Sequence, residues 1–362
     1  MMPMCDLPEP AWADIDLTAL DANIRRIVQQ VSPARLMIVL KSGAYGHGML
    51  PVAAHAYAAG IRFFGSLTIA DGLTLRADAL PEDARIFAWL HTPDDRFAEA
   101  AAAGIEFGIS TTAELDTIVA ATAVSSEPAR VHLKIDTGLR RNGASAADWP
   151  DLVEHAAGLQ RTGLVRVEGI WSHLAEASDD ADTTALREFD AAVKVAKSRG
   201  VTPPLKHIAA SCAGLIRPDA RYDLVRMGAF PLGIAPGGGV SPRELELVPV
   251  MTLMARIVEV TEADGIRRAR LPIGISDGMS SAYAGTVSVS VGGARCTVLS
   301  VGLSETDIDV GDAIVNVGDV CIFFGPGAHG EATLQEWADA VGTIGEEIVV
   351  RLSPHLPRHY HG

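Results

Sequence analysis

A lysine at the end of an apolar run is the first residue of this sequence that could do chemistry. Lys41 follows the segment "RLMIVL" and precedes the glycine-rich stretch "SGAYGHG". Burying an ammonium group without a partner is costly, so such a lysine shifts its pKa or binds an anion. A desolvated lysine is also a more reactive amine, suited to forming a Schiff base. The alternative is a lysine whose charged end reaches the surface from a strand end, and Lys41 alone does not separate the two.

Further polar side chains stand at or just beyond the ends of other apolar runs: Arg141, His173, Ser211 and Arg226. We expect the strand interiors to be otherwise apolar. In a barrel of parallel strands, chemistry collects at the C-terminal strand ends, so these residues should converge on one mouth. The segment "RMGAF" adds the glycine backbone at Gly228, where barrels often bind phosphate. A lysine, two arginines, a serine and such a turn predict pyridoxal phosphate, whose aldehyde needs a lysine amine.

The elements that must position these residues alternate along the chain from about Arg35 to Gly228. The strand-like runs are "RLMIVLK", "IRFFGSLT", "ARIFAWL", "IEFGIS", "VHLKIDTG", "VRVEGIWSH", "LKHIAAS" and "DLVRMG". Alanine-rich helical patterns separate them, and several end at glycine, which suits a helix C-cap. Continuous apolar strands alternating with helices imply a parallel sheet covered on both faces. Eight of them predict a (β/α)₈ TIM barrel, preceded by a helix "LTALDANIRRIVQQV" with Asp16 as its N-cap.

The pattern changes after "GIAPGGGVSPRELE". Segments from "VMTLMARIVEVTEA" to "IGEEIVVRLSP" alternate with period two between glycine turns, with one short helix in "ATLQEWADAVG". This predicts a mainly antiparallel β domain. With the boundary in the glycine-rich stretch Pro236–Val240, residues 1–240 form the cofactor-binding barrel and residues 241–362 form the β domain. The tail "PHLPRHYHG" resembles a metal site only weakly, and we expect it to be a frayed terminus.

Composition limits the class of protein. The 362 residues, 48% of them hydrophobic, suffice for one large core and a smaller domain. A formal net charge of −15 argues against nucleic acid and anionic membrane surfaces as partners. We find no signal peptide, and no run approaches the roughly 18 apolar residues of a membrane span. The four cysteines are Cys5, Cys212, Cys296 and Cys321. They form no CxxC pair, so they indicate neither a metal site nor a disulfide framework. We therefore expect a cytoplasmic protein.

The sequence resembles the alanine racemases, pyridoxal-phosphate enzymes of fold type III with a (β/α)₈ barrel and a C-terminal β domain. The resemblance runs nearly end to end, through "AWADIDLTALDANI", "VLKSGAYGHG", "KIDTGLRRNG", "GIWSHLA", "HIAASCAGL", "VRMGAFPLGIAP", "LPIGISDG" and "RLSPHLPRHY". It implies an amino-acid racemase, which is an isomerase, acting on a small amino acid. It also implies a homodimer in which the β domain of one subunit completes the active site of the other.

The resemblance assigns roles to the residues around the cofactor. Lys41 would bind the cofactor aldehyde and act as the base on the D face of the substrate. Tyr45 and Ser211, with the backbone of Gly228 and Ala229, would hold the phosphate.

Other roles concern the cofactor ring and the substrate. Arg226 would face the pyridine nitrogen, and because arginine does not readily give up its proton, the electron sink is weakened. Arg141 would lie near the ring hydroxyl and the substrate carboxylate, and His173 would support a second base. Lys134 matches a lysine that many members carry as a carbamate, and the alternative is a plain ion-paired lysine.

Three segments depart from the family pattern. The tyrosine that serves as the second base belongs to a "GYADG"-like motif, which reads "GISDG" here, with Ile275 at its place. Leu303 and Ser304 replace the methionine and aspartate of an "MDQ"-like segment, and Pro354 replaces a second tyrosine. Racemisation is simplest with a base on each face of the α-carbon, and isoleucine carries no proton. The candidates for a replacement base are Ser276, Asp277, Tyr283, His355, His359 and His361.

Three interpretations therefore stay open. The first is a racemase with an altered substrate range. The second is a one-base pyridoxal-phosphate lyase, such as a D-amino-acid aldolase, dehydratase or decarboxylase, with Lys41 as its base. The third is a catalytically silent cofactor-binding homologue.

Overall fold

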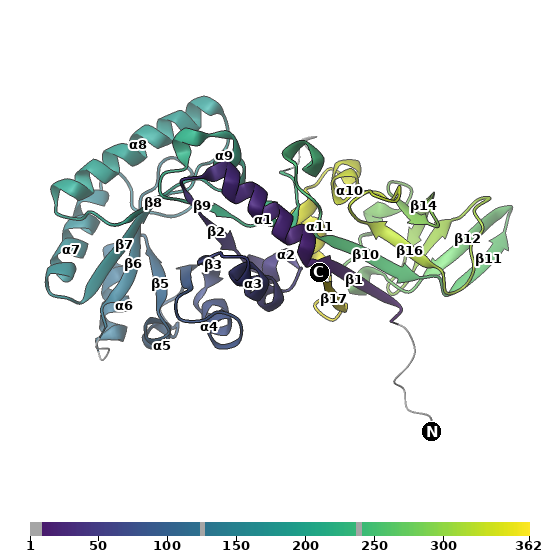
Figure 1. Ribbon diagram of the computed structural model, residues 1–362, viewed down its shortest axis with the longest axis horizontal. Helices are drawn as coiled ribbons and strands as arrows, with labels where there is room; N and C mark the ends of the chain where they lie inside the picture. Colours follow the sequence, from purple (N-terminus) through teal and green to yellow (C-terminus); the bar gives the residue numbers. More distant parts are fainter. Residues whose placement is uncertain (1–8, 124–126, 237–240) are drawn as a thin grey trace, which may run out of the picture. The chain divides into compact units, whose positions relative to one another are not determined.

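The computed structural model describes residues 9–123, 127–236 and 241–362 (Figure 1). The described chain divides into two compact units. The barrel unit comprises residues 25–41 and 49–228, and the β unit gathers the described parts of 1–24, 42–48 and 229–362. Cys5 and most of the expected boundary, residues 237–240, lie outside the described residues. The division at residue 240 therefore stays a prediction.

Eight parallel strands form the sheet of the barrel unit, in the order β8-β7-β6-β5-β4-β3-β2-β9. Two backbone hydrogen bonds join its end strands: Asp223 N donates to Lys206 O, and Arg226 N donates to Ala209 O, each at 3.1 Å. The predicted (β/α)₈ fold is confirmed. Each strand overlaps a predicted run, and only β6 extends beyond its run, starting two residues earlier: β2 (Arg35–Val39), β3 (Phe63–Thr68), β4 (Arg85–Leu90), β5 (Ile105–Ile109), β6 (Ala129–Lys134), β7 (Val165–Trp171), β8 (Leu205–His207) and β9 (Leu224–Met227).

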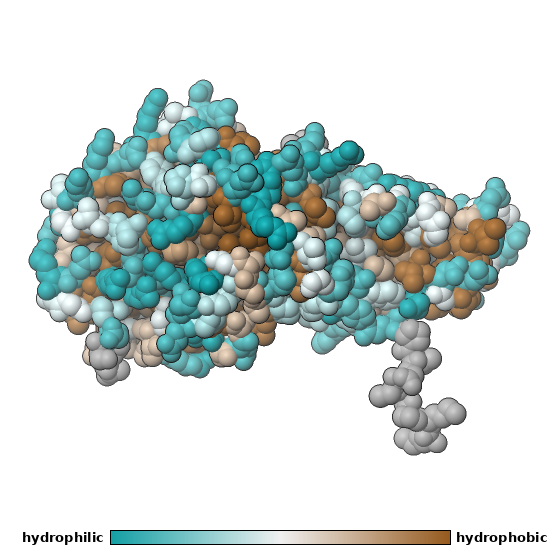
Figure 2. Space-filling view, viewed as in Figure 1, coloured by the Kyte–Doolittle hydropathy of each residue, from teal (hydrophilic) through white to brown (hydrophobic). Residues whose placement is uncertain are grey.

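Helices form the outer layer of the barrel unit: α3 (Met49–Ala58), α4 (Ile69–Asp78), α5 (Phe97–Ala102), α6 (Thr112–Thr122), α7 (Trp149–Arg161), α8 (Asp179–Ser198) and α9 (Ser211–Ile216). Hydroxyl side chains cap the starts of three of them, where Thr68, Thr111 and Ser178 accept hydrogen bonds from backbone amides of the first turn. On the face shown in Figure 2, hydrophilic residues cover much of this layer. The predicted first helix is α1 (Leu17–Val31), where Asp16 Oδ1 accepts from Ala19 N at 3.0 Å.

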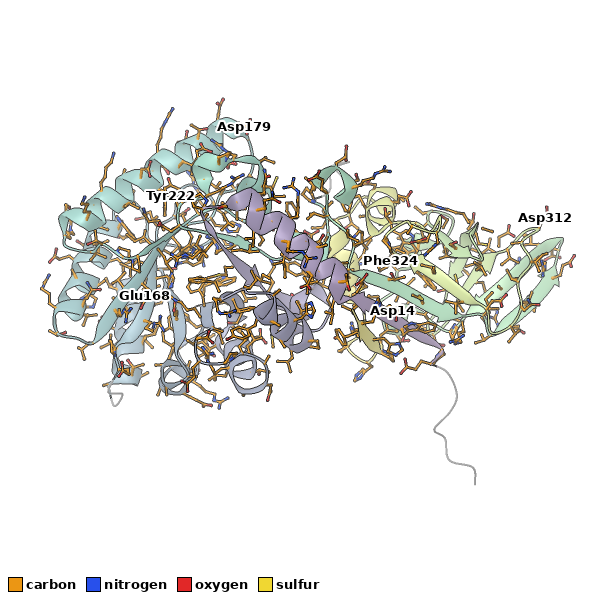
Figure 3. All side chains as sticks on the ribbon, in the orientation of Figure 1. Asp14, Glu168, Asp179, Tyr222, Asp312 and Phe324 are labelled. Carbon is orange, nitrogen blue, oxygen red and sulfur yellow. The ribbon has the colours of Figure 1, made fainter. Side chains whose placement is uncertain are left out.

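The interior of the barrel is not apolar throughout, so our expectation of otherwise apolar strand interiors is wrong. A cluster of large side chains, among them Phe87 and Trp171, fills part of the core. Buried charged and polar side chains lie on the same strands: Glu106, His132, Glu168, His207 and Arg226. Glu168, labelled in Figure 3, is on β7. The barrel tolerates these groups because four of them bond to one another and Glu168 bonds to Arg85.

The β unit contains one sheet in the order β11-β12-β15-β14-β13-β16-β10-β1-β17. Its neighbouring strands pair antiparallel except β1 with β17. The strands are β1 (Ala11–Asp16), β10 (Met251–Arg256), β11 (Glu259–Ala263), β12 (Ile266–Leu271), β13 (Ser288–Val291), β14 (Ala294–Val301), β15 (Thr306–Asp309), β16 (Val320–Phe324) and β17 (Arg358–His361). A mainly antiparallel β architecture is thus confirmed, and the expected short helix is α10 (Leu334–Val341).

Two expectations for the last twenty residues are wrong. The run "IGEEIVVRLSP" forms a helix, α11 (Gly345–Arg351), whose first turn carries Glu346 and Glu347, where acidic residues favour a helix N-terminus. The tail is ordered as well, because β17 pairs in parallel with β1, from Ala13 opposite Arg358 onward. Within the described residues, no helix combines the length and apolar character of a membrane-spanning segment.

Candidate active site

Six of the predicted site residues follow the C-terminal ends of barrel strands. They are Lys41 beyond β2, Arg141 in the loop after β6, His173 beyond β7, Ser211 at the start of α9, Arg226 on β9 and Gly228 directly after β9. Since all the strands run parallel in one sheet, these residues meet at one edge of it. Tyr45 and Ala229 belong to the β unit, and their part in a phosphate site stays a prediction.

Arg226 makes several hydrogen bonds within the barrel unit. Its guanidinium is buried, and Nη2 donates to Ser172 O at 2.8 Å, to Ile208 O at 3.1 Å and to His173 Nδ1 at 3.1 Å. A guanidinium has only donors, so His173 Nδ1 must be the acceptor. Arg226 therefore fixes the tautomer of neutral His173, whose proton lies on Nε2.

His173 lies in a field of positive charge. Burial lowers its pKa to about 2, and the charges of Arg226, Arg141, Lys134 and Lys41 add to this effect in decreasing order. The imidazole is therefore neutral, and the cationic groups around it form a site for an anion. A phosphate, a carboxylate or a phenolate oxygen suits such a donor set.

Lys134 is buried at the end of β6. Its ammonium lies 4.1 Å from the centre of the Trp171 ring and donates to Asn142 Oδ1. Burial, and then the charges of Arg226 and Arg141, lower the pKa of Lys134 to about 7. A large fraction of this side chain is thus an uncharged amine near neutral pH.

The chain takes an unusual backbone conformation directly after Lys41. Residues 42–46 all have positive φ, between 51° and 78°, which makes one left-handed helical turn. Within it, Gly46 N donates to Ser42 O at 3.0 Å. A left-handed conformation costs roughly 1–2 kcal/mol for each residue that is not glycine. The turn that follows the lysine is therefore strained, and other contacts must hold it.

The side chain of His47 and the C-terminal strand supply these contacts within the β unit. His47 Nδ1 donates to Tyr45 O at 2.9 Å, and burial lowers the pKa of His47 to about 4, so its ring is neutral. Arg358 Nε donates to Gly46 O at 2.9 Å, and the hydroxyl of Tyr360 donates to His47 O at 3.0 Å. The residues that we expected to fray thus stabilise the turn.

Glycine is required at positions 46 and 48, where the turn approaches the C-terminal residues. A Cβ at Gly46 would lie 2.4 Å from Val349 O, and a Cβ at Gly48 would lie 1.9 Å from the hydroxyl of Tyr360. Both glycines also have positive φ, of 78° and 98°. The glycine-rich stretch after the lysine therefore provides the backbone conformation and the space for the C-terminal residues.

The loop that carries Ile275 is exposed on the β unit. Ile275 begins a short 3₁₀ turn, with 45% of the residue exposed. Its amide donates to Gly302 O at 3.0 Å, and Ser276 N donates to Leu303 O at 2.9 Å. Leu303 is itself 76% exposed. Two adjoining loops thus present apolar side chains at two of the positions where we expect the sequence to depart from the family pattern.

Tyr283, one of the candidate replacement bases, is in a different environment. Its residue is only 2% exposed, and its ring lies 4.9 Å from that of Trp337. Burial raises the pKa of its hydroxyl. Tyr283 lines a cavity of about 260 Å³, whereas Ile275 lines another of about 370 Å³, and Arg351 borders both. Tyr283 is therefore a core side chain of the β unit and does not take the exposed place of Ile275.

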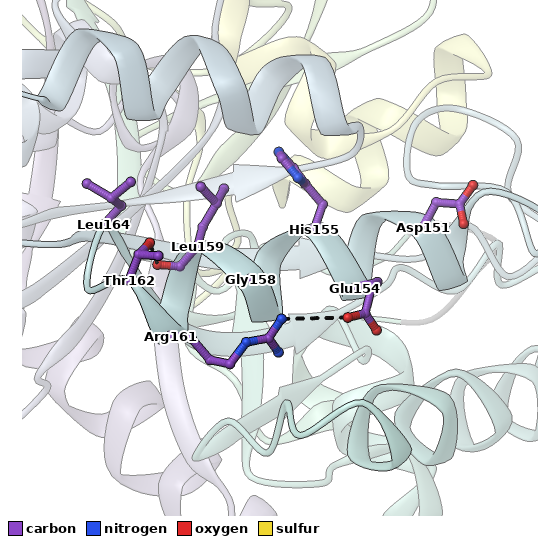
Figure 4. Close-up of a pocket in the computed structure, with 8 residues that line it drawn as sticks. All are labelled: Asp151, Glu154, His155, Gly158, Leu159, Arg161, Thr162 and Leu164. Atoms are coloured by element: carbon purple, nitrogen blue, oxygen red, sulfur yellow. Dashed lines mark hydrogen bonds and ion pairs between the residues drawn. The ribbon is translucent and has the colours of Figure 1, made fainter.

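A surface hollow of about 610 Å³ lies along α7 (Figure 4), and none of the predicted site residues lines it. It is shallow and includes an ion pair of 3.7 Å between Arg161 and Glu154. The hollow is a feature of the outer helical layer, and the chemistry belongs to the strand ends.

Comparison with known proteins decides the family. A family model described as "Alanine racemase, N-terminal domain" matches residues 15–236, and one described as "Alanine racemase, C-terminal domain" matches residues 258–360. The chain belongs to the alanine racemase family. The alanine racemase of Thermobifida fusca is 39% identical over 97% of this chain and 98% of its own length. The fold agrees closely with two solved structures of alanine racemases.

The first is from Streptomyces coelicolor, with a TM-score of 0.93, 37% identity and coverage of 97% of this chain and 98% of that one. The second is from the D-cycloserine producer Streptomyces lavendulae, with a TM-score of 0.94, 34% identity and coverage of 99% and 98%. Members of the family are pyridoxal-phosphate-dependent racemases, that is, isomerases. The donor set at the strand ends fits this cofactor, since cationic groups surround a neutral histidine and a buried arginine.

Sequence reasoning missed several buried residues that contact this site. His207 accepts from Arg226 at 3.0 Å, His132 bonds to His207, and Trp171 packs against Lys134. A signal was present, because His132 alternates with Lys134 on one strand, and residues two apart face the same side of a strand.

We expect Tyr360→Phe to lower the free energy of unfolding by about 1 kcal/mol, because it removes the bond to His47 O and leaves that carbonyl unpaired. Denaturant unfolding measures this. Tyr57→Phe is the matched control, since the Tyr57 hydroxyl bonds the exposed carboxylate of Asp83. An equal loss in both variants would contradict a special role for the Tyr360 hydroxyl.

We expect Lys134→Met to remove a component of the pH dependence of stability. In the wild type the pKa of Lys134 is about 7 when folded and 10.5 when unfolded. Between these values the unfolded chain binds more protons, so the free energy of unfolding rises with pH across that window. Denaturant unfolding in carbon-dioxide-free buffer should show a flatter profile for Lys134→Met. Lys206→Met, at a half-exposed lysine of the same barrel, should keep the wild-type slope.

Proposed function

We propose that this protein is a pyridoxal-phosphate-dependent amino-acid racemase of the alanine racemase type with an altered substrate range. The observation that carries the proposal is the arrangement of buried Arg226, neutral His173 and the cationic groups around them, at the edge of the barrel that also carries Lys41. A protein without chemistry would gain no stability from such a concentration of positive charge.

Pyridoxal phosphate, when bound, withdraws electrons from the α-carbon of an amino acid and so loosens its α-proton. Lys41 would hold the cofactor and move the proton at the α-carbon on the D face. Burial lowers the pKa of Arg226 to about 9, so its guanidinium remains charged near neutral pH and would donate a hydrogen bond to the pyridine nitrogen. Arg141 would orient the substrate carboxylate, and His173 accepts from Arg226 in its neutral form.

Two further parts of the proposal concern the phosphate and a second subunit. Tyr45 and Ser211, with the backbone of Gly228 and Ala229, would bind the phosphate. We propose a homodimer in which the loop of Ile275 completes the partner's site. A cytoplasmic location also stays a prediction.

The altered substrate range rests on the exposed loops of the β unit. Ile275 and Leu303 are apolar and exposed, and the cavity of about 370 Å³ beside Ile275 is bordered by Ser280 and Arg351. An isoleucine in place of a tyrosine removes a ring and a hydroxyl. Such a surface favours a substrate with a larger side chain than that of alanine.

Ile275 also supports a second candidate, a one-base lyase. Isoleucine can neither accept nor return a proton, and Tyr283 is buried away from the exposed position. With Lys41 as the only base, cleavage of a bond to the α-carbon on the D face needs no proton transfer on the other face. An aldolase, dehydratase or decarboxylase acting on D-amino acids would have this property.

Carbamylation of Lys134 is a further part of the proposal. A lysine with a pKa of about 7 supplies the uncharged amine that attacks carbon dioxide, giving a carbamate anion and a proton. The neighbouring positive charges of Arg141 and Arg226 would stabilise the anion. The Asn142 amide, which accepts from Lys134, would hold the modified side chain in place.

Exchange of the α-proton tests the reaction. The holoenzyme is incubated in D₂O with L- and D-amino acids, and the products are followed by NMR and chiral chromatography. We expect deuterium in both enantiomers, with inversion, and a loss of more than about 100-fold in Lys41→Ala, as for removal of a catalytic base. Exchange or cleavage confined to D-substrates would support the lyase instead, and cofactor binding without exchange would support the silent homologue.

A gain-of-function variant tests whether position 275 is the place of the second base. Ile275→Tyr restores a proton-carrying side chain at the exposed position, so we expect faster racemisation of alanine. Leu303→Tyr is the matched control, because it adds the same ring to the adjoining exposed loop. Equal rates in both variants would show that the place of the tyrosine does not matter.

Mass spectrometry of the intact protein, kept in bicarbonate, tests the carbamate. We expect added mass corresponding to one carbon dioxide, lost on acidification and absent in Lys134→Arg, whose guanidinium stays protonated. An unchanged mass in bicarbonate would contradict carbamylation.

A further inference from the structure

A continuous row of hydrogen bonds runs through the interior of the barrel unit to Arg226. Arg226 Nη1 donates to His207 Nδ1 at 3.0 Å, and His207 Nε2 lies 2.9 Å from His132 Nδ1. His132 Nε2 lies 2.7 Å from Glu106 Oε2. All four side chains are at least 95% buried, with exposed fractions of 5%, 0%, 0% and 2% along the row.

The donor-only chemistry of arginine sets the direction of every bond. Because the guanidinium donates, Nδ1 of His207 accepts, and the proton of this neutral ring lies on Nε2. That N–H donates to His132 Nδ1, so the proton of His132 also lies on its Nε2. His132 then donates to Glu106, which as a carboxylate can only accept. One tautomer of each histidine satisfies the row.

We propose that Glu106, His132 and His207 are positioning residues that orient the guanidinium of Arg226 toward the cofactor ring. The carboxylate fixes the tautomer of His132, and His132 fixes that of His207. His207 then presents a bare nitrogen to Arg226 and cannot compete as a donor. This inference rests on the proposed function, since the ring nitrogen that Arg226 would meet belongs to the proposed cofactor.

The carboxylate end of the row is anchored as an anion. Burial raises the pKa of Glu106, but the hydrogen bonds from His132 and Arg85 outweigh it and lower the pKa to about 2. Arg85 Nε donates to Glu106 Oε1 at 2.6 Å, and Arg130 Nη2 lies 2.9 Å from the same oxygen. Glu106 is thus held from outside the row, at the opposite end from Arg226.

The space around the imidazoles is closely filled. A Cβ at Gly169 would lie 2.1 Å from His132 Nδ1, so only glycine at this position of β7 leaves room for the ring. The ring of Phe87 lies 4.5 Å from that of His132 and 5.7 Å from that of His207. The Trp171 ring stacks on His207 at 5.8 Å. Aromatic walls keep water from the row, which strengthens its bonds.

The neutral state of His207 also avoids a second positive charge beside Arg226. Burial, and then the charge of Arg226, hold the pKa of His207 well below its usual range. The ring therefore stays neutral and does not repel the guanidinium. Since its only lone pair accepts from Arg226, His207 would hold the orientation of the guanidinium toward a bound cofactor ring.

Glu106→Gln tests the row, and Glu168→Gln is the matched control. Both glutamates are buried and pair with Arg85 and Arg130, but Glu168 has no bond to either histidine and instead meets Arg166 at 2.7 Å. The two variants therefore lose similar ion pairs. Only Glu106→Gln removes the anionic acceptor at the end of the row.

The first measurement is nitrogen-15 NMR of the histidine rings in the protein without cofactor. In the wild type we expect His132 and His207 each to carry the proton on Nε2, as the directions of the hydrogen bonds in the row require. We expect Glu106→Gln to shift both ring spectra and Glu168→Gln to leave them unchanged. Protonated Nδ1 in the wild type, or equal shifts in both variants, would overturn the proposal.

The second measurement uses pyridoxal phosphate labelled with nitrogen-15 in its ring. We expect the ring-nitrogen signal to shift in Glu106→Gln and to stay unchanged in Glu168→Gln. We also expect α-proton exchange in Glu106→Gln to fall by up to about 100-fold, because a small misplacement of a positioning group has an effect of this size. If Glu106→Gln does not fold, Gly169→Ala replaces it, since its methyl group displaces His132. If the histidine spectra are as expected but no substrate exchanges its α-proton, the row of hydrogen bonds is supported and the proposed reaction is contradicted. An unmoved ring nitrogen with bound cofactor would overturn the link between the row and Arg226.

Discussion

The buried guanidinium of Arg226 is the constraint on which this site depends. A charge taken out of water destabilises the fold unless its donors find acceptors, and the barrel supplies two backbone carbonyls and two imidazole nitrogens. The carbonyls of Ser172 and Ile208 are available because these residues directly follow the ends of β7 and β8. The same bonds make His173 a neutral acceptor, so its state depends on the arginine. Removing one partner would leave a buried charge uncompensated.

Positive charge concentrated at one edge of the barrel has a chemical consequence. Burial, and then this charge, lower the pKa of Lys134 and of His173, and the charge creates a place for an anionic ligand. A barrel that only had to fold would place these side chains at the surface, where water solvates them. The cost of the arrangement is offset by the ion pairs of Glu106 and Glu168 deeper among the strands. The ion pairs within the strands thus stabilise the barrel, whereas the residues at the strand ends form the candidate site.

The left-handed turn after Lys41 is held in place by residues from a distant part of the sequence. The barrel strand β2 leads to the lysine, but the strained residues 42–46 are held by Arg358 and Tyr360, more than three hundred residues later in the sequence. Local sequence explains the glycines, which permit positive φ. It does not explain Tyr45, which adopts a disfavoured conformation because tertiary hydrogen bonds compensate for it. By contrast, Ile275 and Leu303 lie on exposed loops, where a change of side chain alters recognition at little cost to the fold.

The sequence by itself determined the eight-stranded barrel, the antiparallel β unit and the strand ends that carry Lys41 and Arg226, because hydrophobic periodicity and glycine turns are local properties. It could not determine the row from Arg226 to Glu106, since those residues lie on four different strands and a bond between them depends on register. The tail and α11 were misassigned for the same kind of reason: pairing of β17 with β1 joins the two ends of the chain. Only the tertiary structure decided which polar groups meet, because burial makes each unpaired donor or acceptor costly and so selects the packing in which all are satisfied.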